Sequence, residues 1–270
     1  MCFNGFAMRL FLHLIKLSIL EQATYRTALV AGLVTNFFWG FFRAAVIVAL
    51  YNGRSEVNGL TLEGALTYIA IGQAMIAFLS LFGTFDLMTT VYSGSIASDL
   101  IRPVPLFVLW MARDLGHSLV NLVVRGLLLL LFFALFYPVV MPESLLGWVW
   151  TILALAASWL VSYAWRFLVN LAAFWTPDAR GIGRGAYALS QLASGFIIPL
   201  RLYPEWFSRL CHLTPFPAMF NTGVEVYLGV VSGSQLGWAL GVQGMWFIVL
   251  VFLSQIILRA GIRKLVIQGG

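Results

Sequence analysis

Charged side chains are scarce in this sequence. Asp, Glu, Lys and Arg make up 10% of its 270 residues, hydrophobic residues make up 61%, and the mean hydropathy is +0.93. A water-soluble domain carries about 25% charged and about 45–50% apolar residues. A soluble fold of this size cannot bury so much apolar surface, so the composition predicts an integral membrane protein.

Motifs for nucleotide, nucleophile and metal chemistry are also missing. The sequence has no Gly-Lys pair, which excludes a P-loop, and no serine stands in a Gly-x-Ser-x-Gly pattern. Its 3 histidines lie far apart, and its 2 cysteines match no zinc or redox spacing. We therefore expect no enzyme activity, no metal site and no cofactor in this chain.

Long apolar runs are what the sequence does contain. A helix that crosses the hydrocarbon needs about 20 mostly apolar residues. The sequence predicts an all-α membrane protein with one transmembrane domain over residues 1–270 and six transmembrane helices, at 28–51, 61–85, 117–136, 146–175, 185–200 and 236–258.

The first 25 residues form a different pattern. Arg9, His13 and Lys16 fall on one helical face and leucines on another, which predicts a helix over 1–25 that lies in the membrane interface. A signal peptide is disfavoured because these charges interrupt its apolar core and no cleavage site follows. A seventh span remains an alternative.

The basic residues indicate the orientation. With both termini on one side, most Lys and Arg outside the spans fall on that side, and Arg54, Arg201 and Arg209 fall on the other. This bias predicts cytoplasmic termini. The net charge of +6 is spread between apolar runs, so we expect a lipid bilayer as partner and no nucleic acid.

Polar residues recur on helical faces inside three predicted spans. Ser158, Ser162, Arg166 and Asn170 repeat every fourth residue, and all acidic residues map to loops or span ends, so no intramembrane acid is expected to pair with the arginines. The arginines either reach headgroups and backbone carbonyls or line a cationic transport pathway, for which the candidates are Arg43, Asn121, Arg125, Ser162, Arg166 and Asn170.

Residues 201–230 are too polar for a span and too aromatic for an ordinary loop. Their prolines permit two short helices, and their rings suit the outer interface. We expect an outer re-entrant helical hairpin, or else a simple interfacial anchor. The candidate outer gate is formed by Pro204, Trp206, Phe207, Pro215 and Phe216.

A polar break, "SGSIASDLIRPVPLF", spans residues 93–107 within the segment 86–114. Together with "ARDLG", "YPEWF…LTPFPAMFNTGVEVYLG" and the terminal "RKLVIQGG", it makes the chain resemble permease subunits of type-2 ABC exporters, in a bacterial branch near drug and antibiotic efflux. The resemblance covers nearly the whole chain.

The resemblance implies an inner-membrane efflux subunit that exports an amphiphilic substrate. It pairs with a second permease, identical or paralogous, and with two cytoplasmic ATP-binding subunits that hold ATP and Mg. The polar break is then a cytoplasmic coupling helix between spans two and three, which contacts the ATPase through Ser98, Asp99, Leu100, Ile101, Arg102 and Pro103. A plain polar loop is the alternative, and a membrane scaffold or an ion-gradient carrier is the alternative function.

Overall fold

The computed structural model describes residues 5–24, 26–176 and 178–264. The first residues of the predicted interfacial helix, and most of the "RKLVIQGG" motif, lie outside this part of the chain. The elements in chain order are α1 (Gly5–Thr24), α2 (Arg26–Tyr51), β1 (Glu56–Val57), β2 (Leu60–Thr61), α3 (Leu62–Met75), α4 (Asp86–Tyr92), α5 (Ile96–Leu100), α6 (Leu106–Asn121), η1 (Leu122–Gly126), α7 (Leu127–Phe136), α8 (Leu145–Asn170), η2 (Leu171–Phe174), α9 (Arg180–Ala193), η3 (Leu200–Leu202), α10 (Glu205–His212), α11 (Phe216–Met219), α12 (Asn221–Tyr227) and α13 (Ser234–Ile262).

Four helical stretches among the described residues are long and apolar enough to cross a bilayer. They cover Val30–Tyr51, Leu106–Phe136, Leu145–Phe174 and Ser234–Ile262. Each coincides with a predicted span, and the all-α class is confirmed. The second of these stretches begins well before the predicted span 117–136, because α6, η1 and α7 form one continuous rod.

The other two predicted spans are interrupted, so the count of six is not confirmed. Helix α3 ends after 14 residues, and the backbone that follows takes positive φ at Ser80 (48°) and Gly83 (76°). Helix α9 ends at Ala193, and Gly195 has a φ of 82°. A right-handed helix cannot continue through such dihedrals.

Helix α1 packs against α6. Leu14 and Ser18 are buried there, and a Cβ atom on Gly116 of α6 would lie 2.7 Å from the carbonyl oxygen of Ile15. Only glycine permits this approach of the two backbones. Leu12, on the other side of α1, is 57% exposed. The position of α1 in the membrane interface stays a prediction.

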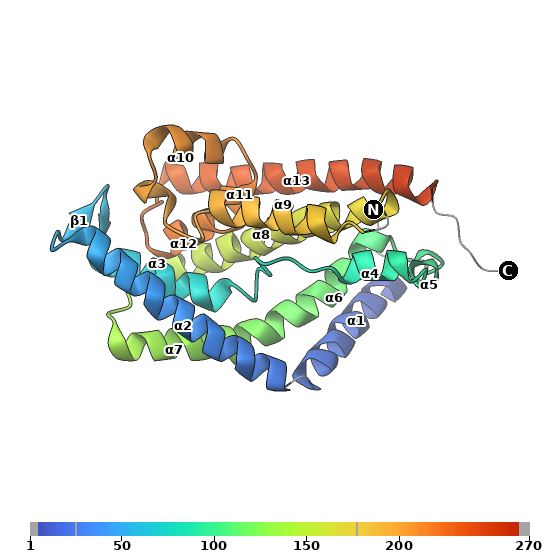
Figure 1. Ribbon diagram of the computed structural model, residues 1–270, viewed down its shortest axis with the longest axis horizontal. Coiled ribbons are helices and arrows are strands. Elements are labelled where there is room, and N and C mark those ends of the chain that lie inside the picture. The colour runs from blue at the N-terminus through green and yellow to red at the C-terminus, as the bar shows by residue number, and fades with distance from the viewer. Residues whose placement is uncertain (1–4, 25, 177, 265–270) are drawn as a thin grey trace.

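The molecule is elongated, and its two ends differ. The short helices α4 and α5 lie at the end where α13 finishes, whereas the β1–β2 hairpin and α10 lie at the opposite end (Figure 1). The central helix α8 packs against α11, α12 and α13. This arrangement separates the predicted coupling segment from the predicted outer hairpin by the length of the helical rods.

Candidate functional site

Helices α4 and α5 form a short helical corner. Gly94, with a φ of 74°, separates them, and Pro105 precedes the first residue of α6. At the tip of this corner the side chain of Ile101 is 85% exposed, and Ser98, Arg102 and Pro103 are exposed beside it. An isolated apolar side chain at such a tip, surrounded by polar groups, can fill an apolar pocket of another protein.

Asp99 occupies the inner side of the corner. It is 4% exposed, and Arg113 of α6 donates to both of its carboxylate oxygens, at 2.8 and 3.0 Å. Arg102 also lies 3.6 Å from it. Asp99 therefore fixes α5 on α6, and the direct polar contact with a partner that we predicted for it is not available in this arrangement.

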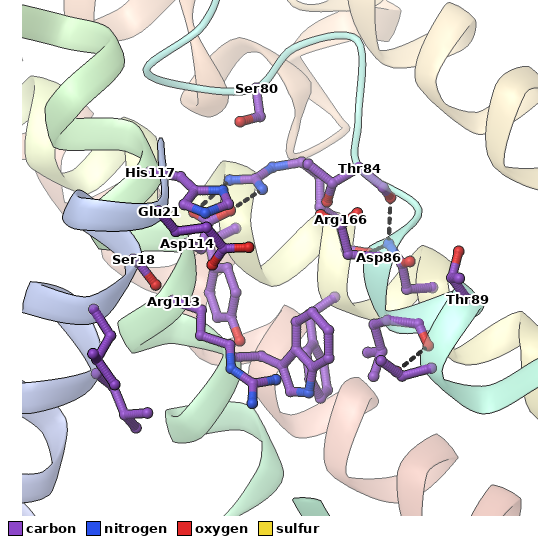
Figure 2. Close-up of a pocket in the computed structure, with 18 of the residues that line it drawn as sticks. Ser18, Glu21, Ser80, Thr84, Asp86, Thr89, Arg113, Asp114, His117 and Arg166 are labelled. Atoms are coloured by element: carbon purple, nitrogen blue, oxygen red, sulfur yellow. Dashed lines mark hydrogen bonds and ion pairs between the residues drawn. The ribbon is translucent and has the colours of Figure 1, made fainter. Parts of the chain in front are cut away.

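A polar cavity of about 710 Å³ lies directly behind the corner. Figure 2 shows Ser18 and Glu21 of α1 on one side and Asp86 and Thr89 of α4 on the other, with Arg166 of α8 at the back. Three of the predicted pathway residues line it: Asn121, Arg166 and Asn170. The structure does not bring the other three, Arg43, Arg125 and Ser162, to this cavity.

An ion pair crosses the cavity between α6 and α8. The Arg166 guanidinium donates twice to the Asp114 carboxylate, once at 2.9 Å and once at a shorter distance. Trp159 donates to the same carboxylate at 2.9 Å. Arg166 is almost fully buried, so Asp114 compensates a charge that would otherwise be costly.

This ion pair corrects the prediction that no acid would meet the arginines. We placed the start of the span at His117, which assigned Asp114 to a loop, whereas α6 begins at Leu106. The signal was present, because Asp114, His117 and Asn121 share one helical face at spacings of three and four residues. The late predicted start of this helix also hid Arg113 and Trp110, which lie on α6 and line the cavity.

Two other polar residues of α8 bond to backbone carbonyl groups that have no helical partner where the span after α3 is interrupted. Ser162 donates to the carbonyl of Leu79 at 2.6 Å, and Asn170 donates to the carbonyl of Thr84 at 2.8 Å. Tyr187 of α9 adds a second bond to Thr84 at 3.0 Å. Non-helical backbone at membrane depth must be protein-covered and hydrogen-bonded, and these side chains do both.

Arg43 bonds to the non-helical backbone that follows α9, at the second interrupted span. Its guanidinium donates to the carbonyl of Phe196 at 3.2 Å and lies 4.0 Å from the centroid of that ring. Tyr68 of α3 donates to the carbonyl of Gly195 at 3.0 Å. The expectation that an arginine would cap backbone carbonyls is met here, whereas a role of Arg43 in the transport pathway stays a prediction.

The predicted outer hairpin contains α10, α11 and α12. Pro204 and Trp206, at the start of α10, are exposed, and Phe207 packs against Tyr203. Phe216 follows Pro215 and is buried against Trp165 of α8, with ring centroids 5.1 Å apart. The segment thus passes from the end of the molecule to a contact beside Arg166, as a re-entrant hairpin would; its action as a gate stays a prediction.

Cys211 of α10 offers a test of this packing. It is 2% exposed, and burial raises the pKa of its thiol above the usual value of 9.0. Less thiolate is then present at neutral pH, and access is blocked. In a Cys2→Ser background we expect slow maleimide labelling at pH 7.4 in lipid or detergent and rapid labelling after unfolding in SDS.

The matched control is Leu210→Cys in a background in which Cys211 is also Ser. Leu210 is the neighbouring residue and is 53% exposed, so a thiol there should react at once in the folded protein. Equal labelling rates at the two positions would contradict the buried placement of Cys211.

Within the part of the chain that the structure describes, no group of three or more His, Cys, Asp or Glu side chains could hold a metal ion. The candidate site consists of the exposed tip at Ile101, the ion pair between Asp99 and Arg113, and the polar cavity. The chain matches the family described as ABC-2 family transporter protein over residues 33–269. It belongs to this family.

The protein is accordingly a permease subunit of a type-2 ABC transporter, a multi-pass membrane protein whose family works with an ATP-binding partner. Comparison with curated proteins and with solved structures finds no match.

Proposed function

We propose that this ABC-2 permease exports an amphiphilic substrate (a drug, lipid, lipopeptide or glycan) by alternating access, driven by a separate ATPase that docks on α5. The observation that carries this proposal is the exposed Ile101 at the tip of a corner that Asp99 and Arg113 hold rigidly on α6. A rigid mount is needed if force applied at the tip is to move a long helix.

The proposed complex contains two permease subunits, identical or paralogous, and two ATP-binding subunits in a bacterial inner membrane. Both termini and α5 face the cytoplasm, and α10 faces the outside. ATP and Mg bind to the partner, and this chain hydrolyses no nucleotide. Family membership and the location of α5 and α10 at opposite ends support this arrangement (Figure 1).

In the proposed cycle, closure of the two ATPases pulls the two α5 tips together. Because α5 is clamped to α6, and α6 is paired with α8 through Asp114 and Arg166, the pull moves two long helices as one unit. The permease then alternates between two arrangements of similar free energy, which the ATPase biases.

An ion-gradient carrier would need a free carboxylate at membrane depth. Asp114, on one of the candidate spans, has both oxygens occupied by Arg166 and a further bond from Trp159. It is therefore not available to bind a proton or a sodium ion in this arrangement. This supports ATP as the energy source.

The decisive experiment replaces Ile101 with Asp in the full transporter. Putting a charge where an apolar pocket is expected should reduce co-purification of the ATPase by at least about tenfold, since a lost apolar anchor costs about 2 kcal/mol or more. ATP-dependent transport in proteoliposomes should fall with it. The matched control is Leu213→Asp, which charges another highly exposed apolar residue (74%) just after α10.

Normal ATPase binding and transport by the Ile101→Asp variant would reject the docking role of α5. Transport that stops with an uncoupler while ATP remains would reject ATP as the driver. A complex that binds the ATPase through Ile101 but moves no substrate in liposomes would instead identify a scaffold.

A further inference from the structure

Arg125 differs from the other arginines in the candidate spans that are at least partly buried. The structure gives Arg43, Arg113 and Arg166 polar partners, namely Phe196, Asp99 and Asp114. Arg125 is half-buried in η1, and its Nε atom is buried without a hydrogen bond. Among the described residues, none forms an ion pair or a hydrogen bond with its guanidinium.

The surroundings of Arg125 are shaped to admit it. Its guanidinium lies against Gly32 of α2, where an added Cβ atom would stand 2.2 Å from its terminal nitrogen. Any side chain at position 32 would displace it. Arg125 also lies in the π-helical turn Leu122–Gly126, and such turns insert a residue and redirect side chains at functional sites.

The level of this site in the membrane follows from α2. Gly32 is six residues from the start of α2, which is about 9 Å at 1.5 Å per residue. At that start the chain turns the corner between α1 and α2 (Figure 1). A guanidinium at this height is within reach of the headgroup layer of one leaflet.

The surface around the site is apolar and open. Val124 and Leu128, one residue before and three residues after Arg125 on the same helical rod, are 37% and 50% exposed. These side chains suit acyl chains, and the unpaired guanidinium beside them suits a phosphate, which it can bind through two parallel hydrogen bonds.

We propose that Arg125, seated against Gly32 between α2 and η1, binds the phosphate of a membrane lipid. A lipid satisfies both observations together, since its phosphate meets the unpaired donors and its acyl chains cover the exposed Val124 and Leu128. This site is separate from the polar cavity and from α5, so the proposal requires membrane insertion and not the proposed transport cycle.

The test uses the full-length protein in dodecyl maltoside with added dioleoylphosphatidylglycerol. Native mass spectrometry should show one retained lipid on the wild type, and the lipid should raise its melting temperature by linkage. Arg125→Gln should bind this lipid about tenfold more weakly, because charge-assisted hydrogen bonds are lost, and its melting temperature should no longer respond.

Two further variants keep the positive charge. Gly32→Ala should weaken lipid binding because its methyl group occupies the place of the guanidinium, and Arg125→Lys should give an intermediate affinity because the planar fork is lost. Arg209→Gln removes an exposed positive charge at the opposite end and should bind like the wild type.

Dioleoylglycerol, which has the same chains without phosphate, should not bind at this site. If it protects the wild type equally, or if Arg125→Gln and Gly32→Ala retain the phospholipid like the wild type, phosphate recognition by Arg125 is rejected. If millimolar inorganic phosphate replaces the lipid effect, the site takes a free anion and the lipid assignment is wrong.

Discussion

Replacing Asp114 with Asn is expected to destabilise the protein by about 3 kcal/mol. The change keeps the shape of the side chain and its contact with Trp159, but it leaves the guanidinium of Arg166 charged and almost fully buried without a counter-ion. Thermal unfolding in detergent, followed by tryptophan fluorescence, measures the loss.

Two controls isolate the charge effect. Glu205→Gln breaks an ion pair with Arg209 in which both side chains are largely exposed (80% and 77%), so its unfolding should hardly change. The double variant Asp114→Asn/Arg166→Gln removes both charges and should recover part of the loss. A melting temperature for Asp114→Asn within experimental error of the wild type would contradict a stabilising ion pair between Asp114 and Arg166.

Replacing Gly83 with Ala is expected to cost about 3 kcal/mol. The residue has a φ of 76°, and its new Cβ atom would lie 1.9 Å from the ring of Tyr187. That ring cannot swing aside freely, because its hydroxyl group donates to Thr84 and accepts from Asn170. The variant should therefore melt at a clearly lower temperature and lose yield on purification.

The control is Gly94→Ala. Gly94 has nearly the same φ, 74°, but nothing lies within 4 Å of an added Cβ atom. Gly94→Ala should lose only the stability that a left-handed backbone costs a residue with a Cβ atom, about 1 kcal/mol. The difference between the two variants measures the contact with Tyr187, and equal melting temperatures would exclude that contact.

The sequence predicted the long helices well, since hydropathy reports burial in lipid directly. It did not predict where two spans are interrupted. The residues after Met75 are as apolar as those before it, so their hydropathy continues while their backbone departs from the helix. Gly83 and Gly195 carried a hint of the positive φ at the two interruptions, and Ser80 carried none.

The site was predicted in part. The exposure of Ile101 agrees with the polar character of residues 93–107. The burial of Asp99 could not be predicted from its position in the sequence. The partner of Asp99 is Arg113, 14 positions away across a turn with two prolines, a distance that helical periodicity cannot bridge. The pairing of Asp114 with Arg166 depends on how α6 and α8 cross, which is a tertiary property.

The hydrogen bonds that cover residues 76–85 have a consequence for biosynthesis. The carbonyl groups of Leu79, Leu81 and Thr84 are synthesised long before the side chains of Ser162, Asn170 and Gln191 that bond to them. Residues 76–85 therefore reach their final, hydrogen-bonded form only when translation has passed α9. A ribosome that stalls between α3 and α9 should leave a nascent chain that membrane quality control removes.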